Sequence, residues 1–175
     1  MWGWDRQSIA TDKRCDVRDI SLRPVTEDNW REALSLTVRP DQQRFVAQYQ
    51  PVVAIALAKA YVRLGGATWI PYAAYEAASM VGFAQLAYWP DAPEQCWIFH
   101  FFIDQRYQGR GYGKATLAHL IELVEREYAA CKALLLVVHP DNERAQHLYL
   151  GAGFRLTGAV RYGEPVYELA LRHAP

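Results

Sequence analysis

Seven consecutive residues carry most of the chemical information in this chain. Residues 108–114 read Gln-Gly-Arg-Gly-Tyr-Gly-Lys. The three glycines leave little side-chain bulk, so backbone N–H groups can approach a ligand closely. The amphipathic run that follows predicts a helix, whose N-terminus adds unpaired donors and a partial positive charge. Arg110 and Lys114 add full charges, and an arginine fork suits phosphate oxygens. The segment therefore predicts a phosphate-binding loop.

Two common phosphate-binding loops do not match this segment. The P-loop of nucleotide-binding proteins needs Gly, four residues, Gly-Lys and then Ser or Thr. Here Gln108 stands at the first glycine position and Ala115 at the hydroxyl position. The dinucleotide fingerprint needs G-x-G-x-x-G and an acidic residue at the end of the next strand. The glycines here are spaced two apart, and the next expected strand, 134–138, is followed by His139.

The elements around the loop follow from the apolar pattern. Residues 97–103 form an apolar run broken only by His100, which predicts a strand buried on both faces. Helical spacing predicts a helix from the loop to about residue 130. A second buried strand is expected at 134–138, then a helix at 142–150 with Asp141 or Asn142 as its N-cap.

The rest of the chain predicts a mixed α/β domain. We expect a first strand ending at Pro24, two helical regions, a hairpin, and an antiparallel C-terminal pair. The expected ranges are 30–36 and 40–64 (helical, with Asp41 as an N-cap), 68–75 and 80–89 (hairpin, then a loop over 90–93), and 154–157 and 166–171 (C-terminal pair around a connection at 158–164). The order is β-α-α-β-β-β-α-β-α-β-β. Residues 1–17 are expected to be an N-terminal extension and residues 18–175 one domain.

Composition narrows the function classes. The chain has 175 residues, 51% of them apolar, and a formal net charge of +0, so charge gives no sign of a nucleic-acid or membrane partner. Three scattered cysteines lack metal-site spacing, and no apolar leader is visible. These features predict a cytoplasmic protein without a metal. They leave the oligomeric state open, a homodimer included.

A third kind of glycine loop matches. Residues 108–113 fit the pattern Gln/Arg-x-x-Gly-x-Gly/Ala of the GNAT acetyltransferases. Residues Asn142, Ala145, 148–149 (Leu-Tyr) and 153–154 (Gly-Phe) resemble the second signature of that family. The order of elements agrees over about residues 18–171. The resemblance implies the GNAT fold, with a splayed central sheet, and acetyl-CoA as co-substrate. It places the coenzyme on Phe101, Phe102, Ile103, Gln108, Gly109, Arg110, Gly111, Tyr112, Gly113, Lys114, Asn142, Ala145 and Tyr149.

Two residues are candidates for proton transfer. Tyr149 follows Asn142 by seven residues, on nearly the same helix face, and a phenol with a pKa of about 10 can protonate a departing thiolate. The alternative to a proton donor is that Tyr149 is an aromatic residue packed in the core. In some relatives a glutamate before the Asn signature acts as the general base. Residues 136–139 of this chain contain no carboxylate. His100 is the other candidate base, because burial would keep it neutral. One alternative is that His100 is a core histidine hydrogen-bonded to a neighbour. Another is that a chain of water molecules to bulk solvent deprotonates the amine.

The acceptor is the least determined part. Residues 41–47, 81–84 and 101–109 resemble bacterial spermine/spermidine acetyltransferases, which implies direct transfer to a primary amine of a small molecule such as a polyamine. A polycation needs acidic partners, and the candidates are Glu27, Asp28, Glu32, Asp41, Asp91 and Glu94. An aromatic-walled pocket could form from Trp69, Tyr72, Tyr88, Trp89 and Trp97. The alternatives are a non-catalytic acyl-CoA-binding module, or an acetyltransferase for a peptide or protein N-terminus or an aminoglycoside-like amine.

Overall fold

The fold is built on one seven-stranded sheet. The computed structural model describes residues 19–46 and 50–172, so the expected extension over 1–17 lies outside the described residues. The strand order is β1-β2-β3-β4-β5-β7-β6, and only β4 and β5 pair in parallel. The strands are β1 (Ile20–Pro24), β2 (Thr68–Glu76), β3 (Ser79–Trp89), β4 (Ala92–Ile103), β5 (Ala133–Val137), β6 (Arg155–Arg161) and β7 (Glu164–Ala170).

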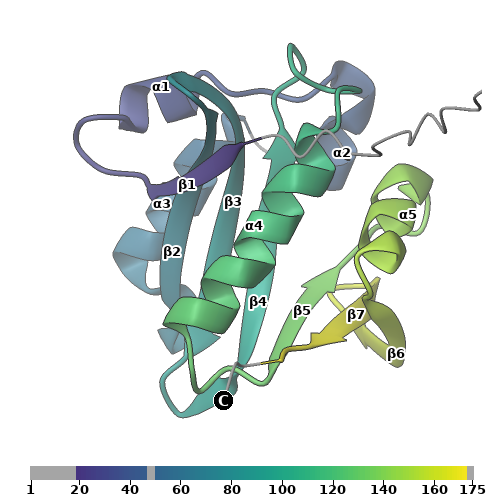
Figure 1. Cartoon of the computed structure of the whole chain (residues 1–175). Coiled ribbons are helices and arrows are strands. Elements are labelled where there is room, and N and C mark those ends of the chain that lie inside the picture. Colours follow the sequence, from purple (N-terminus) through teal and green to yellow (C-terminus); the bar gives the residue numbers. More distant parts are fainter. Residues whose placement is uncertain (1–18, 47–49, 173–175) are drawn as a thin grey trace, which may run out of the picture.

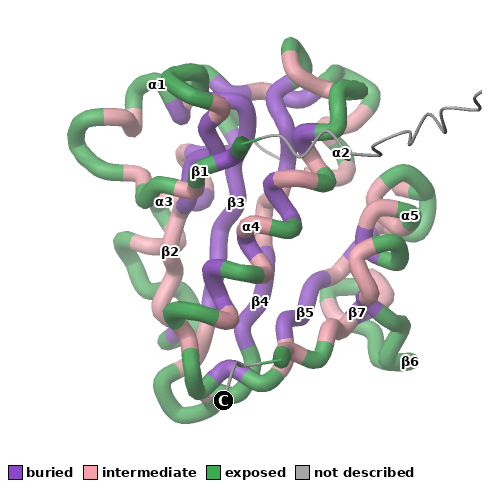
Figure 2. The backbone as a smooth tube through the Cα atoms, viewed as in Figure 1, coloured by how far each residue is buried: buried purple, intermediate pink, exposed green. Residues whose placement is uncertain are grey.

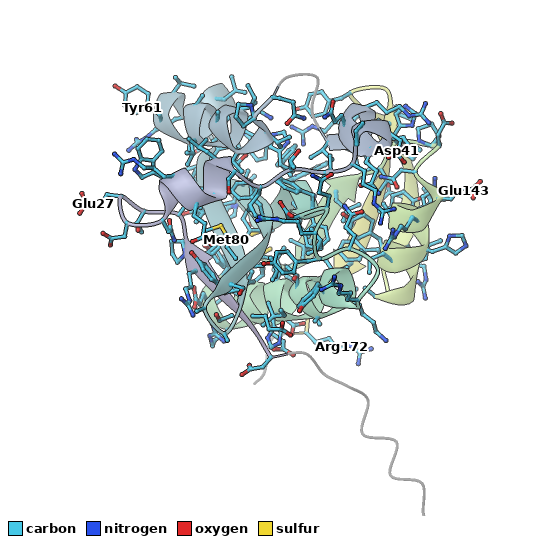
Figure 3. All side chains as sticks on the ribbon, turned by 90° about the horizontal axis from the view of Figure 1, so that it is seen from above. Glu27, Asp41, Tyr61, Met80, Glu143 and Arg172 are labelled. Atoms are coloured by element: carbon cyan, nitrogen blue, oxygen red, sulfur yellow. The ribbon has the colours of Figure 1, made fainter. Side chains whose placement is uncertain are left out.

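Helices cover both faces of this sheet. They are α1 (Trp30–Leu34), α2 (Gln43–Val46), α3 (Val52–Val62), α4 (Tyr112–Glu127) and α5 (Glu143–Gly151), with short 3-10 turns η1 (Pro40–Gln42) and η2 (Leu64–Gly66). Viewed from above, α3 and α4 lie on opposite sides of the sheet (Figure 3). The larger core lies under α4 and α5, and a second core lies under α1 and α3. Figure 2 shows β3 buried along most of its length between these two layers. The predicted mixed α/β order is confirmed.

Three expected segments differ in detail. The helical region over 40–64 divides into η1, α2 and α3, and Asp41 lies inside η1 instead of capping it. The loop expected over 90–93 is only a tight turn, because β4 already begins at Ala92. Pro93 is tolerated there because β5 pairs with β4 only from Gln95, so the strand has one neighbour at that point.

The C-terminal connection also differs. The segment expected as a loop at 158–164 is mostly strand, and β6 and β7 join through a turn at Tyr162 and Gly163. Both residues have positive φ, 55° and 81°, as a tight hairpin turn requires. Gly158, at φ 82°, lies within the irregular part of the β6–β7 pairing. The pairing is antiparallel, as predicted.

The central feature of the sheet is the divergence of β4 from β5. These strands pair only where Gln95–Trp97 face Ala133–Leu135, and they separate beyond that point (Figure 1). The pairing of β4 with β3 also shifts register opposite His100, which has a positive φ of 49°. The shift is a β-bulge, which bends a strand locally. The middle of β4 is therefore half-buried, not buried on both faces as expected, because it lines the gap that β5 has left.

Candidate active site

The glycine-rich loop joins the end of β4 to the start of α4. Gly109 and Gly111 have φ values of 79° and 85°, a region that suits glycine, and Gly111 is the N-cap of α4. Within residues 19–46 and 50–172, no hydrogen bond engages the backbone N–H groups of Gly109, Gly111 or Gly113. The loop therefore presents free donors at the positive end of a 16-residue helix.

Two side chains, Gln108 and Asp104, hold this loop in place. The Gln108 amide nitrogen donates to the carbonyl oxygen of Ile103 (2.9 Å) and to Oε1 of Gln42 (2.8 Å). Asp104, which the sequence analysis missed, accepts from the backbone N–H of Thr37 (3.0 Å) and Arg106 (2.9 Å) and from the Arg106 side chain (2.7 Å). Burial tends to raise the pKa of Asp104, but these hydrogen bonds hold it below its usual value. The buried carboxylate ties the loop to the segment after α1.

A cavity of about 330 Å³ lies beside the loop. Of the thirteen residues expected to hold coenzyme, all but Arg110 line it. Arg110 is exposed outside the lining. The cavity also receives Arg144 from the first turn of α5, which the sequence analysis missed, and Gln42, Phe45 and Val46 from the segment that crosses above the diverging strands. No Asp or Glu is among the lining residues that the structure describes, while Lys114 and Arg144 are cations.

Three of the residues expected to bind coenzyme have side chains that contact other parts of the protein. The Tyr112 hydroxyl donates to Oε2 of Glu76, so its ring points into the core beside β1 and β2. Phe102 packs against Phe83 in the core under α3. Asn142 caps α5, and its Oδ1 accepts from the Ala145 N–H at 3.2 Å. Capping was the alternative interpretation of Asn142, and it is compatible with lining the cavity.

Tyr149 lies where this cavity meets a second one. Its ring packs between Phe101 (6.1 Å between ring centroids) and Phe154 (5.7 Å). The second cavity, of about 290 Å³, lies between the diverging strands and includes Phe99, Val137 and Glu164 in its lining. Tyr149 lines both cavities. No hydrogen bond engages its hydroxyl within the described ranges, and burial raises its pKa, which keeps the phenol protonated.

The comparisons with known proteins fit this geometry. Residues 23–154 match the Acetyltransferase (GNAT) family. The chain belongs to the GNAT acetyltransferases. A spermine/spermidine N(1)-acetyltransferase of Bacillus subtilis (strain 168) is 31% identical over 153 residues, 84% of this chain and 95% of that protein. An uncharacterized N-acetyltransferase of the same strain is 27% identical over 164 residues, 90% of this chain and 98% of that protein.

Solved structures show the same fold. An aminoglycoside acetyltransferase in complex with coenzyme A has a TM-score of 0.70 at 21% identity, covering 87% of this chain and 95% of that one. A spermidine N-acetyltransferase from Vibrio cholerae, in complex with coenzyme A and spermine, has a TM-score of 0.65 at 16% identity, covering 85% and 92%. The family match, together with the relative at 31% identity, makes this GNAT protein an N-acetyltransferase whose acetyl donor is acetyl-CoA.

His100 of this acetyltransferase is held at both ring nitrogens. Nε2 lies 2.8 Å from Nζ of Lys59, and Nδ1 lies 3.1 Å from the carbonyl oxygen of Val46. Because a carbonyl only accepts, Nδ1 carries the proton and the Nε2 lone pair faces Lys59. Burial, together with the charge of Lys59, lowers the pKa of His100 to about 4. The ring is neutral, as a base requires, but its lone pair is already engaged; its catalytic role stays a prediction.

The acidic and aromatic residues expected around the acceptor do not line either of these two cavities. None of the six acidic candidates lines either cavity; Glu27 extends away from the fold (Figure 3), and Asp91 lies in the β3–β4 turn. None of the five expected aromatic residues lines them either. Tyr72 is in the main core, and Trp97 packs against Leu135 and Val166. The carboxylate that does line the second cavity is Glu164, which sequence reasoning missed because it lies in a hairpin far along the chain.

Proposed function

We propose that this chain transfers the acetyl group of acetyl-CoA directly to a primary amine of a small molecule. One observation carries the proposal: a cavity beside the glycine loop and a cavity between the diverging strands share Tyr149, Phe101 and Asn142 among their lining residues. Two reactants, one in each cavity, can therefore meet at one phenol. Holding two reactants in this way removes much of the entropic cost of a bimolecular step.

The first cavity fits the coenzyme. Its walls carry the unpaired N–H groups of the glycine loop and the cations Lys114 and Arg144, without a carboxylate among the described lining residues. Such a site suits a pyrophosphate. Beyond Trp97, β4 has lost its pairing with β5. Phe99 and Phe102 pair with β3, and no strand that the structure describes pairs with the other edge of β4 there, which leaves this edge available to a pantetheine arm. When bound, acetyl-CoA supplies an activated acetyl thioester.

Tyr149 is the proposed proton donor. Its hydroxyl has no partner among the described residues, and burial raises its pKa, so it holds a proton throughout the neutral range. A group that must give a proton to a departing thiolate needs this property. The two described cysteines, Cys96 and Cys131, are buried away from both cavities, which supports direct transfer without an acyl-cysteine.

The acceptor class rests on the relatives and on charge. Polyamines are the first candidates, because the Bacillus subtilis relative at 31% identity is named for spermine and spermidine. Among its described lining residues, however, the second cavity has one carboxylate, Glu164, beside Arg44, His100 and His139. It therefore suits one ammonium group and the alkyl carbons next to it better than an entire polycation.

A thiol-release assay tests the proposal. The protein is given acetyl-CoA with spermidine, an alkyl monoamine, an aminoglycoside, an amino acid or a peptide N-terminus, and free thiol is followed. We expect release with at least one small amine. Calorimetric binding of coenzyme A without thiol release from any amine would instead identify a non-catalytic acyl-CoA-binding module.

A further inference from the structure

Glu164 is placed in the second cavity by the C-terminal hairpin. It is the first residue of β7 and pairs with Arg161 of β6 across the turn. The next residue, Pro165, accepts a hydrogen bond from the backbone N–H of Val138, at the end of β5 (3.3 Å). Because β7 lies between β5 and β6, the side chain at its start reaches the gap that β4 and β5 leave open.

The Glu164 carboxylate has no fixed partner within residues 19–46 and 50–172: neither a hydrogen bond nor an ion pair engages it there. It is half-buried and is the sole carboxylate among the described lining residues of that cavity. A polar group that is removed from water without a partner is costly. A ligand that supplies the missing partner would be correspondingly favoured.

Of the other ionisable groups among the described lining residues of this cavity, Arg44, His139 and His100 already have partners, and Tyr149 is protonated. Arg44 of α2 forms an ion pair with Asp141 (3.4 Å). His139, after β5, accepts at Nδ1 from the backbone N–H of Asp141 (3.1 Å). His100 of β4 is held between Lys59 and Val46, and Tyr149 of α5 is a protonated phenol. Arg161, the β6 neighbour of Glu164, lies over the ring of Trp97 at 4.2 Å.

Burial also makes Glu164 a better proton acceptor. It raises the pKa of the carboxyl above its usual range, and the nearby His139 opposes this effect. The ideal base has a pKa close to the working pH, and a raised carboxyl pKa moves toward that value.

We propose that Glu164 binds the acceptor ammonium and accepts its proton. This rests on the amine acetyltransferase function proposed above. The nitrogen loses one proton, an O–H bond forms on Glu164, and the former N–H electron pair becomes the nitrogen lone pair. That pair forms the C–N bond to the acetyl carbon while the C–S bond breaks. The departing sulfur takes the proton of the Tyr149 hydroxyl. The nitrogen then loses a second proton, which goes to the Tyr149 oxygen and restores the phenol. Glu164 then returns its proton to water.

The kinetic test compares Glu164→Gln with Glu168→Gln. Gln keeps the size of the side chain and removes its charge and basicity. Glu168 is on the same strand, half-buried, and lines neither cavity of the site. We expect Glu164→Gln to lower kcat/KM for the amine by about 100-fold, to raise the KM of the amine, and to leave the KM of acetyl-CoA within about twofold. Glu164→Asp should recover part of the rate, and Glu168→Gln should match the wild type.

A second readout does not depend on turnover. Protein labelled with ¹³C at the glutamate side-chain carboxyl is titrated by NMR, and the Glu164 signal is identified by its loss in Glu164→Gln. We expect a midpoint above the ordinary glutamate value, and a lower midpoint when the best amine of the panel is added, because an ammonium stabilises the carboxylate.

The outcomes separate the two proposals. If wild-type protein acetylates an amine but Glu164→Gln keeps its amine KM, rate and pH profile, the assignment of Glu164 is overturned and the amine acetyltransferase function stands. A Glu164 midpoint that the amine does not move would likewise overturn it. If no amine yields thiol with the wild type, the proposed function fails, and the assignment of Glu164 fails with it.

Discussion

At the scale of single residues, Tyr149 is the proposed proton donor. Replacing Tyr149 with Phe removes the hydroxyl and keeps the ring that packs between Phe101 and Phe154. We expect kcat to fall by about 100-fold, within the range for a lost general acid, with the affinity for coenzyme A unchanged. Steady-state kinetics and calorimetry measure the two quantities. Tyr61→Phe, on the exposed end of α3, is the matched control; equal rates in both variants would remove Tyr149 from this role.

His100 makes a prediction about stability. Its pKa is lowered to about 4 in the folded protein, against about 6.5 when unfolded. The folded state therefore binds fewer protons, so this contribution to stability is present above pH 6.5 and is lost as the pH falls toward 4. It amounts to up to about 3 kcal/mol. In denaturant titrations, His100→Asn should lose less stability than the wild type between pH 6.5 and 4. Parallel losses in the two proteins would contradict this.

The same variant separates two candidate bases. If Glu164 accepts the proton, the acidic limb of kcat/KM against pH persists in His100→Asn and disappears in Glu164→Gln. Loss of the limb in His100→Asn alone would restore His100 as the base, through release of its Nε2 lone pair from Lys59.

At the scale of elements, the start of α4 depends on Gly111. A side chain there is strained at a φ of 85° and blocks the approach of a phosphate to the loop. Gly111→Val should weaken coenzyme A binding by at least about tenfold, or 1.4 kcal/mol, by calorimetry. Gly158→Val is the control, because Gly158 has a similar φ of 82° on exposed β6. Both variants should lose stability, but only Gly111→Val should lose affinity; equal affinities would place the phosphates elsewhere.

At the scale of the whole molecule, coenzyme binding depends on the folded sheet. The first cavity joins residues from α2, β4, α4 and α5, so coenzyme A should bind the folded state alone and raise the Tm. At 100 times Kd the stabilisation is about 2.7 kcal/mol. Pantetheine, which lacks the phosphates, should shift the Tm less; an equal shift would show that the glycine loop contributes nothing.

The whole fold also explains which parts of the site the sequence could predict. The loop at 108–114 lies in one short motif, and Asn142 and Tyr149 lie in another on a single helix. Local spacing predicts each motif, and the resemblance to the GNAT acetyltransferases implies that the two motifs lie at one site. Glu164 could not be found in this way. Its place beside His139 depends on β7 inserting between β5 and β6, and a hairpin pattern does not reveal where in the sheet its strands will lie.

The same reasoning applies to His100 and Asp104. Local sequence placed His100 in a strand, but its engagement by Lys59 needs α3 to pack behind β4. Asp104 depends on Thr37, which is 67 residues away along the chain. Contacts of this kind depend on tertiary packing. The divergence of β4 from β5 depends on tertiary packing as well, so the local sequence does not predict it.

We propose that acetyl passes directly from coenzyme A to a small amine at Tyr149. Mass spectrometry of the N-acetylated amine, quantified against the thiol released in the same reaction, tests this transfer. We expect one molecule of acetylated amine for each thiol. Thiol release without an acetylated amine, or acetyl retained on the protein, would contradict it.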